Sequence, residues 1–414
     1  MAPGKQFDGL PRGGHSGMRI FFSAGEPSGD QHAARLTSAL QKLNPEIRLE
    51  GFGGPAMQAA GCHLLFELTT MAVMGFLRVL PLLARFRRLV QLAEAHFDSS
   101  PPDAVVLVDF PGFNWWIAKA AKKRGIPVIY YLPPQLWAWA PWRLKKVRRW
   151  VDHVLCTLPF EYNWYRDRGI ECSHVGHPFF DQAADYPIDE ELVRTIRGTG
   201  AQPVVALLPG SRRHEIAANW EVQLQIASKI SAEIPEVRWV VGSYREDQLN
   251  LCQEIQQRIH PELRLAYQLG KTPEVIAAAD FCLLVSGSIS LELLARQRPG
   301  IVLYRIGSIS RFLSRFLMHC RFITLPNLIA ERELMPEFIS SGNPQSDITE
   351  IAEISLHWIR QPDVFAAHRR EFRQLSATTA VPGASDNAAR RICELLQGES
   401  APNSPADRQD LFAA

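Results

Sequence analysis

Short apolar runs alternate with segments of helical periodicity along most of this chain of 414 residues. In the first half, the runs that are typical of buried strands cover Met18–Gly25, Asp103–Phe110, Ile126–Leu132, His153–Phe160 and Glu171–Pro178. Helical patterns run from about residue 30 to 43 and from 115 to 124, and a short helix is expected between the last two strands. Apolar runs of about four to eight residues that alternate with helices indicate parallel strands joined by crossover helices.

The second half repeats this rhythm. Strands are expected at Pro203–Ser211, 238–244, 263–270, Phe281–Gly287 and 300–306. The intervening helices are expected to follow the first of these strands as far as Ala232 and to cover Pro273–Ala279 and Ser290–Arg296. An acidic and then glycine-containing stretch, Asp181 to about Ala201, is the natural boundary between the halves.

We therefore predict an α/β protein with two Rossmann-like, doubly wound domains that face an interdomain cleft. The first domain is expected at 18–182, a linker at 183–200 and the second domain at 201–375. A helix at 376–397 is expected to pack back on the chain or to be swapped, while 1–17 and 398–414 are expected to be disordered.

The composition is that of a soluble globular protein, with 46% hydrophobic and 21% charged residues. Lys and Arg number 45 against 43 Asp and Glu, so the net charge identifies no partner. The seven cysteines are scattered without a CxxC pair, which predicts neither a disulfide framework nor a zinc site and fits the cytoplasm. The N-terminus lacks the apolar core of a secretory signal, and Arg78 and Pro81 interrupt the longest apolar stretch. We expect a chain that is neither secreted nor membrane-spanning.

Three small-residue turns lie between an expected strand and an expected helix, where backbone amides can approach a ligand. GEPSGD (Gly25–Asp30) is the first, and a plain tight turn is its alternative explanation. LLPGSRRHEI (Leu207–Ile216) places Arg212 beside a helix N-terminus, which suits a diphosphate; a capped helix with a solvent-facing arginine is the alternative. VSGSISLELL (Val285–Leu294) adds Glu292, which could accept both hydroxyls of a ribose or complete a capping box.

Asp109 ends an apolar strand in VDFPGFN, at a position expected to point into the cleft. A partly desolvated carboxyl group there would have a raised pKa and could act as a base, although it could equally cap the next helix. His174 and His177 have no further ligands nearby and predict no metal site.

The stretch from Trp115 to Trp150 contains nine Lys or Arg residues and no acid, and seven of the ten tryptophans lie between 115 and 164. Basic groups interleaved with tryptophan could bind nucleic acid, or an anionic membrane surface. The segments Met71–Val90 and Ile309–Ile323 are also apolar with basic residues only, which favours lipid. Buried tryptophans beside a solvated basic helix remain the structural alternative.

The strings SAGEPSGD, GFGGPAMQAAGC, VDFPGFN, WAW, LPFE, VGHP, LLPGSR, SGSISLE and LPNLIAERELMPE occur in one order between Met18 and about Leu396. In this the sequence resembles the lipid-A-disaccharide synthase family, inverting glycosyltransferases of GT-B architecture (glycosyltransferase family 19). The resemblance implies that a diacylated glucosamine is transferred from UDP to the 6-hydroxyl of diacylglucosamine 1-phosphate, without a metal or other cofactor. It also implies a location on the inner face of the inner membrane, and relatives that form homodimers.

The resemblance assigns roles by position. Asp109 would be the catalytic base, with an acceptor site at Ser28, Gly29, Asp30 and Asn114. The nucleotide site would comprise Gly210, Ser211, Arg212, Ser286, Gly287, Ser288, Ser290, Glu292, Arg305 and Asn327. The acyl chains and the membrane would meet Met74, Phe76, Leu77, Leu80, Leu82, Leu83, Arg85, Arg87 and Arg88.

Three positions depart from the family pattern. Arg78 stands in place of a glutamate, Gly112 in place of a second acid and Glu331 in place of a small residue. None of them touches the nucleotide-binding strings, so donor binding is better founded than the identity of the acceptor. The other interpretations are a relative that acts on another lipid-linked acceptor, a UDP-sugar 2-epimerase and a catalytically weakened membrane-surface homologue. Nucleic-acid binding ranks last.

Overall fold

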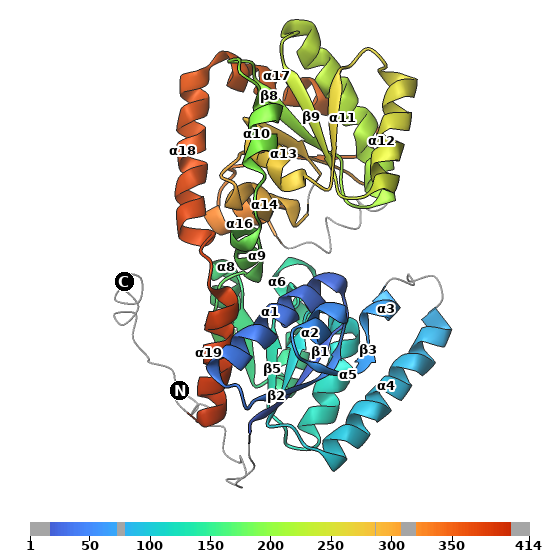
Figure 1. Cartoon of the computed structure of the whole chain (residues 1–414), viewed down its shortest axis with the longest axis vertical. Coiled ribbons are helices and arrows are strands. Elements are labelled where there is room, and N and C mark those ends of the chain that lie inside the picture. The colour runs from blue at the N-terminus through green and yellow to red at the C-terminus, as the bar shows by residue number, and fades with distance from the viewer. Residues whose placement is uncertain (1–16, 73–78, 286, 308–319, 399–414) are drawn as a thin grey trace. The chain divides into compact units, whose positions relative to one another are not determined.

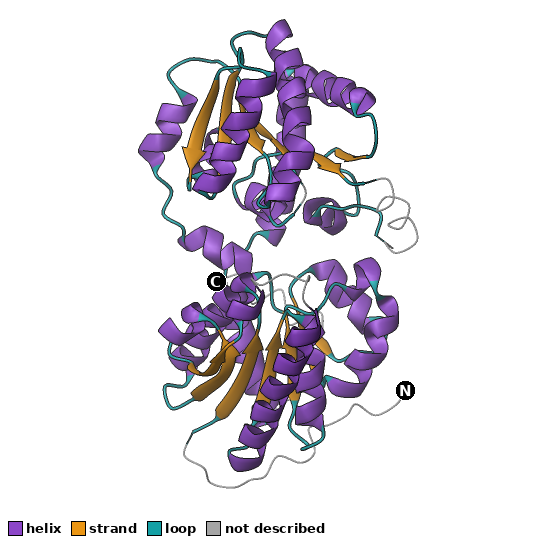
Figure 2. Ribbon diagram, turned by 90° about the vertical axis from the view of Figure 1, so that its right-hand side faces the viewer, coloured by secondary structure: helices purple, strands orange, loops and turns teal. Residues whose placement is uncertain are grey.

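The computed structural model describes residues 17–72, 79–285, 287–307 and 320–398. The chain folds into two compact units, each an α/β body with a parallel sheet at its centre (Figures 1 and 2). Unit 1 consists of residues 1–178 together with 383–414, and unit 2 consists of 179–382. The predicted α/β class with two doubly wound sheets is confirmed.

Unit 1 contains a seven-stranded sheet in the order β3-β2-β1-β4-β5-β6-β7. All its strand pairs are parallel. The strands are β1 Arg19–Ala24, β2 Arg48–Gly53, β3 His63–Glu67, β4 Ala104–Val108, β5 Val128–Tyr131, β6 His153–Cys156 and β7 Cys172–His174. The order reverses between β1 and β4, and in such sheets ligands bind at the carboxyl ends of the strands at this reversal.

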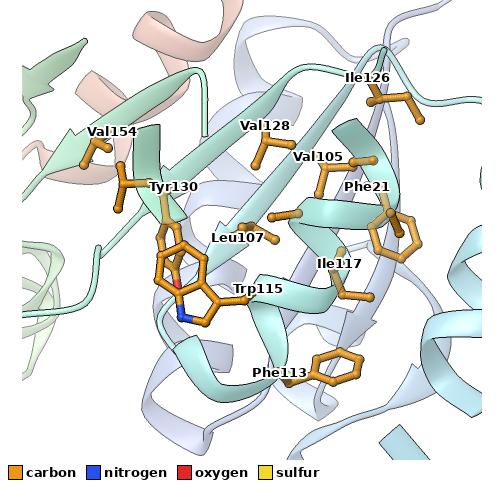
Figure 3. Close-up of a cluster of buried hydrophobic side chains, with 14 of the residues drawn as sticks. Phe21, Val105, Leu107, Phe113, Trp115, Ile117, Ile126, Val128, Tyr130 and Val154 are labelled. Carbon is orange, nitrogen blue, oxygen red and sulfur yellow. The ribbon is translucent and has the colours of Figure 1, made fainter. Parts of the chain in front are cut away.

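Helices cover both faces of this sheet, so its central strand, β4, is apolar throughout. They are α1 Pro27–Leu43, α2 Pro55–Ala59, α3 Thr69–Ala72, α4 Val79–Ser99, α5 Pro111–Lys122, α6 Leu136–Trp139, the 3₁₀ turn η2 Pro141–Arg143, α7 Leu144–Trp150, α8 Pro159–Arg166 and α19 Ala384–Gln397. Every residue of β4 is buried. Figure 3 shows one of the two cores, where Val105 and Leu107 of β4 and Tyr130 of β5 meet the aromatic side chains of α5.

Unit 2 contains a six-stranded sheet in the order β10-β9-β8-β11-β12-β13, which reverses between β8 and β11. Its strands are β8 Val204–Leu208, β9 Arg238–Ser243, β10 Leu265–Leu269, β11 Phe281–Leu284, β12 Gly300–Arg305 and β13 Glu337–Ser340. Its helices are α10 Glu190–Arg197, α11 Arg213–Glu233, α12 Glu246–Ile259, α13 Thr272–Ala278, α14 Ile289–Ala295, α16 Leu325–Ala330, α17 Gln345–Arg360 and α18 Pro362–Thr379. Helix α9, Pro178–Asp185, spans the boundary.

Two of the predicted boundaries differ from the structure. The stretch 183–200 is not a free linker, because α10 packs on α13 and its Ile196 is buried in a core of unit 2. The predicted helix at 376–397 is two elements, since α18 ends at Thr379 and α19 begins after Gly383, whose φ of 108° only glycine adopts easily. Helix α19 packs on α1 of unit 1. Residues 1–16 and 399–414 lie outside the described part of the chain.

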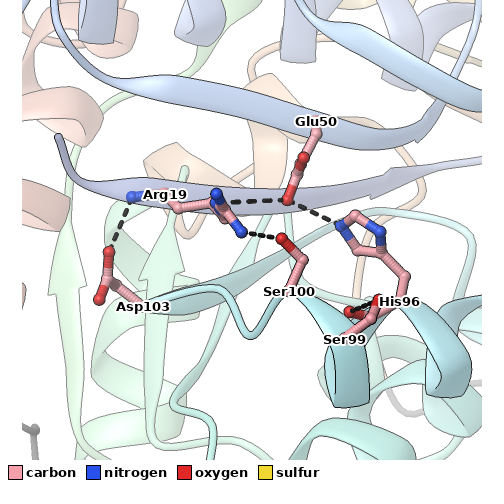
Figure 4. A network of polar contacts seen from close by, with 6 residues as sticks. All are labelled: Arg19, Glu50, His96, Ser99, Ser100 and Asp103. Atoms are coloured by element: carbon pink, nitrogen blue, oxygen red, sulfur yellow. Dashed lines mark hydrogen bonds and ion pairs between the residues drawn. The ribbon is translucent and has the colours of Figure 1, made fainter. Parts of the chain in front are cut away.

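A polar network closes the amino-terminal edge of the first sheet (Figure 4). The amide of Arg19 donates to Asp103 at 2.7 Å, and its guanidinium contacts Ser100 and lies 3.9 Å from Glu50. His96 of α4 bonds the same Glu50 at 2.8 Å. These contacts join β1, β2 and α4 at the edge opposite the carboxyl ends of the strands.

Candidate active site

Asp109 directly follows β4, at the reversal of the strand order in unit 1. Asp109 and Phe110 have φ values of 45° and 47°, so two consecutive residues that carry a Cβ adopt the left-handed conformation. This conformation is sterically disfavoured outside glycine and is typical of functional turns. Gly25 permits it, because a Cβ there would overlap the ring of Phe110.

The carboxyl group of Asp109 is partly buried, and its pKa is raised to about 6. Burial is the main cause, the negative charge of Glu26 adds to it, and a hydrogen bond from the Phe110 amide opposes it. A carboxyl group with a pKa near neutrality can both take up and release a proton under physiological conditions. The position at the strand-order reversal and the raised pKa are both compatible with the predicted base. Asp109 is not the N-cap of α5, because Phe110 occupies that position.

Asn114 lies below this turn and is fully buried. Its amide nitrogen donates to the carbonyls of Asp109 at 2.7 Å, Ser23 at 3.1 Å and Val108 at 3.3 Å. The hydroxyl of Ser23 donates to Asn114 Oδ1 at 2.7 Å. The Asn114 side chain is therefore hydrogen-bonded to the backbone around Asp109, whereas the sequence predicted a direct contact with the acceptor.

The GEPSGD turn is also divided between surface and interior. Ser28 is exposed, whereas Gly29 and Asp30 are buried. The Asp30 carboxylate accepts hydrogen bonds of 2.9 to 3.0 Å from the amides of Gly54, Ala56 and Met57, at the start of α2. Asp30 thus caps α2, an arrangement that favours a structural role over the predicted contact with the acceptor.

In unit 2, the turn at Gly210–Arg212 was predicted to bind a diphosphate, but its backbone amides are bonded to the carboxylate of Glu215. Glu215 of α11 accepts from the amides of Ser211 at 3.0 Å and Arg212 at 3.1 Å, and its second oxygen pairs with the Arg212 guanidinium at 2.9 Å. Gly210 has a φ of 111°, and its Cα approaches Glu215 so closely that a Cβ would lie 2.9 Å from that side chain. The capped helix is therefore present. The Arg212 side chain is 70% exposed and so remains accessible to an anion.

The second nucleotide turn precedes α14. Gly287 and Ser288 are exposed, whereas Ser290 is buried and its hydroxyl donates to the Gly287 carbonyl at 2.9 Å. Ser286 lies outside the described residues. Glu292 pairs with Arg296 at 2.9 Å, so it does not complete a capping box. Burial raises the pKa of Glu292, while Arg296 opposes this.

A group of side chains around Glu292 was not predicted from the sequence. The Arg296 guanidinium lies 5.9 Å from the ring centre of Tyr186, and the Tyr186 hydroxyl donates to the buried Glu274 at 3.3 Å. Tyr186 and Glu274 are 88 positions apart, so no local spacing could have revealed the group.

The last two predicted nucleotide residues differ in accessibility, since Arg305 is half-buried and Asn327 is fully buried. The Arg305 amide donates to Asn219 and its guanidinium to the Gly342 carbonyl, both at 2.8 Å. Asn327 is fully buried; its amide nitrogen donates to the Met335 carbonyl and to Glu337, and its oxygen accepts from two amides. These bonds use the whole polar group, which favours a structural role for Asn327.

The predicted acyl and membrane segment is only partly described. Met74, Phe76 and Leu77, like the departure at Arg78, lie outside the described residues, and Leu80 and Leu82 are placed only as backbone of α4. Further along α4, Leu83, Arg85, Arg87 and Arg88 are exposed, whereas Leu89, Ala93 and Phe97 enter the core. No helix in the described part of the chain is long and apolar enough to cross a membrane.

The tryptophan stretch is divided between core and surface. Trp115 and Trp137 are buried, and Trp137 donates to the buried Glu161. Trp116, Trp139 and Trp142 are exposed. Among the described residues, no three His, Cys, Asp or Glu side chains are grouped so that they could hold a metal ion.

Comparison with known proteins agrees with the motifs. The lipid-A-disaccharide synthetase family matches residues 20–377. The lipid-A-disaccharide synthase of Myxococcus xanthus is 35% identical over 385 residues, which are 91% of this chain and 97% of that protein. That of Idiomarina loihiensis is 36% identical over 335 residues, covering 80% and 88% of the two chains.

Solved structures with the same fold are more distant. An MnaA–UDP co-structure from S. aureus aligns with a TM-score of 0.60 and 12% identity over 94% of this chain and 99% of that one. The calicheamicin glycosyltransferase CalG4 aligns with a TM-score of 0.56 and 15% identity over 94% and 100%. These likenesses confirm the GT-B fold, and the sequence matches confirm the family that the motifs predicted. The chain belongs to the lipid-A-disaccharide synthase family and is a UDP-sugar-dependent glycosyltransferase.

Proposed function

We propose that this enzyme transfers 2,3-diacylglucosamine from UDP-2,3-diacylglucosamine to the 6-hydroxyl of 2,3-diacylglucosamine 1-phosphate. The acceptor oxygen attacks C1 of the donor sugar from the face opposite UDP, so the configuration inverts. A β-1′,6 bond forms, the bond from C1 to the phosphate oxygen breaks, and UDP leaves with the electron pair. The products are the lipid A disaccharide 1-phosphate and UDP.

The observation that carries this proposal is the Asp109 turn. Its carboxyl group lies at the strand-order reversal of unit 1, its backbone is strained, and its pKa of about 6 suits a base. In the proposed reaction the Asp109 carboxylate accepts the proton of the 6-hydroxyl as the new bond forms.

The donor is assigned to unit 2. The exposed Arg212 and the half-buried Arg305 supply positive charge for the diphosphate, together with the exposed turn at Gly287 and Ser288. Glu292, held by Arg296, is the candidate for the ribose hydroxyls. Cationic side chains and amides of this kind can stabilise the charge that develops on a leaving diphosphate. We therefore propose that turnover needs no added metal.

We further propose that the enzyme works as a peripheral protein on the cytoplasmic face of the inner membrane, where both lipid substrates reside. Helix α4 would meet the bilayer through its exposed face, with Leu83 towards the acyl region and Arg85, Arg87 and Arg88 towards anionic headgroups. A homodimer is proposed on the family resemblance alone.

The test mixes the purified enzyme with both diacylated substrates in detergent and follows UDP and the disaccharide by mass spectrometry. The assay is run without added metal and again with EDTA. We expect equal disaccharide formation in both conditions. UDP binding without disaccharide formation would contradict the proposed acceptor. Activity that is lost in EDTA and restored by a divalent cation would contradict the proposed independence of metal.

A further inference from the structure

The turn at Asp109 is held from below by two side chains that do not reach the surface. The Asp109 carbonyl accepts one hydrogen bond from Asn114 at 2.7 Å and another from the Tyr130 hydroxyl at 2.8 Å. Tyr130 is on β5 and Asn114 on α5, and both side chains are fully buried. Two donors of different elements thus fix the orientation of one peptide group.

Both donors are themselves restrained. The Ser23 hydroxyl donates to Asn114 Oδ1 at 2.7 Å, which determines the direction in which the amide group points. The Tyr130 ring lies 5.6 Å from Trp115, centre to centre, in the core drawn in Figure 3. Burial raises the pKa of Tyr130 well above its usual value, so the phenol keeps its proton and remains a donor.

The restraint acts on a conformation that is otherwise disfavoured. Asp109 and Phe110 both have positive φ, and rotating the peptide between them would move the Asp109 carbonyl away from its two donors. Such a rotation would take this acceptor away from the buried Tyr130 hydroxyl and break the shortest of the three hydrogen bonds that the Asn114 amide nitrogen donates, which is costly in a low-dielectric interior. The carboxyl group of Asp109 is attached to the same backbone, so its direction depends on this peptide.

We propose that Tyr130 and Asn114 are positioning residues for the transfer reaction: they hold the Asp109 carbonyl and thereby direct the Asp109 carboxyl group towards the acceptor hydroxyl. Neither touches the reacting atoms. This inference rests on the proposed function, because it requires Asp109 to be the base.

The main test is Tyr130→Phe, which removes one hydrogen bond and leaves the ring in place. We expect kcat to fall about tenfold, as for the loss of one buried hydrogen bond that orients the base, with both KM values within about twofold. The acid limb of the pH profile of kcat/KM should also move down by about half a pH unit or more. A released carboxyl group turns towards water and loses the burial that raised its pKa.

Tyr165→Phe is the matched control. Tyr165 is also fully buried in unit 1 and its hydroxyl also donates to a backbone carbonyl, that of Pro134 at 3.0 Å. It loses an equivalent hydrogen bond away from Asp109, so its kcat and its acid limb should equal those of the unmodified enzyme. If the two variants behave alike, Tyr130 has no positioning role.

Ser23→Ala provides a second route should Tyr130→Phe fail to fold. It removes the bond that orients Asn114 and should lower kcat about threefold with a shift of the acid limb in the same direction. Unchanged kcat and an unchanged acid limb in Ser23→Ala and Tyr130→Phe would overturn the proposal.

Asp109→Asn, measured in parallel, distinguishes failure of the proposed base from failure of the proposed positioning residues. Full turnover in Asp109→Asn would show that Asp109 is not the base. An inactive Asp109→Asn together with a normal Tyr130→Phe would contradict only the positioning role.

Discussion

The carboxyl group of Asp109 is removed from water on one side and faces the negative charge of Glu26, and both effects favour its protonated form. A base must be ionised in order to accept a proton. We therefore predict that kcat/KM falls as the pH drops through about 6 and is level above it, because the pKa of Asp109 lies there. A rate profile between pH 4.5 and 8.5 measures this, and an acid limb near 4 would contradict the burial seen in the structure.

Asp109→Asn is expected to lower turnover by about a hundredfold or more, the usual effect of losing a general base. Asp167→Asn is the control, since it makes the same chemical change at an exposed carboxylate of unit 1. Mass-spectrometric detection of the disaccharide gives the rate. A rate for Asp109→Asn equal to that of the control would exclude Asp109 as the base.

The same substitution should also change stability, with a sign that depends on pH. The folded pKa of about 6 is above the value of an unfolded aspartate, so ionisation of Asp109 destabilises the folded state. This cost is absent below about pH 4 and complete above about pH 6. Asp109→Asn should therefore be more stable than the unmodified enzyme at pH 8, by on the order of 1 to 3 kcal/mol, and equal to it at pH 3.5. Urea unfolding at the two pH values tests this, and a variant that is less stable at pH 8 would contradict it.

Single residues also show what a sequence pattern leaves open. Asp30, Asn114 and Asn327 were predicted to contact ligands, but all three are buried and bonded to backbone groups. Asp30 meets amides 24 to 27 positions away, a pairing that only the fold brings about. Glu215 is different, because a carboxylate three positions after an N-cap is a local signal for a capped helix, and the sequence contained it.

Helix α4 illustrates how one element serves two environments. Leu89, Ala93 and Phe97 lie in the core of unit 1, whereas Leu83 and three arginines are exposed along the same helix. An exposed leucine and three exposed arginines on one helix suit an anionic bilayer.

We predict that the enzyme floats with vesicles that contain anionic phospholipid, and that salt weakens this binding. The double variant Arg87→Glu/Arg88→Glu should bind several-fold less, because it reverses two exposed charges on α4. Arg258→Glu/Arg264→Glu is the control, since it changes the net charge equally at two exposed positions of unit 2. If both double variants float equally, binding does not depend on α4.

Elements with a strong apolar run were predictable, whereas weaker ones were not. Strands β4, β8 and β11 are buried throughout and correspond to the runs in the sequence. Strands β2, β3 and β13 were not predicted; they contain exposed or half-buried residues, and their sequences are short or interrupted by glycine. Their places are determined by pairing with neighbouring strands rather than by their own composition.

On the scale of the whole molecule, the chain returns to unit 1 after building unit 2. Ala388, Ala389 and Ile392 of α19 are buried in the same core as Ile20 and Val106, which precede them by more than 280 positions. The side-chain amide of Asn387 also donates to the Val175 carbonyl at 3.1 Å. The last helix is thus part of the first unit.

Ile392→Ala should therefore destabilise unit 1, by about 2 to 5 kcal/mol as for other large core truncations. Arg390→Ala, at an exposed position of the same helix, should have little effect. Tryptophan fluorescence during urea unfolding reports mainly on unit 1, which contains seven of the ten tryptophans. Equal midpoints for the two variants would show that α19 contributes nothing to the stability of unit 1.

The sequence by itself determined the fold class, the family and the position of Asp109 at the end of a buried strand. These properties depend on local patterns: apolar runs, turn residues and motifs that recur in one order along the chain. The tertiary structure decided which side chains are available to a ligand, because burial and pairing join residues that are distant in sequence. In the folded chain, Asn114 and Tyr130 donate to the Asp109 carbonyl, and the amides of Ser211 and Arg212 donate to Glu215. Helix α19 lies in unit 1. Each of these outcomes depends on contacts between elements, and periodicity along a single element contains no information about them.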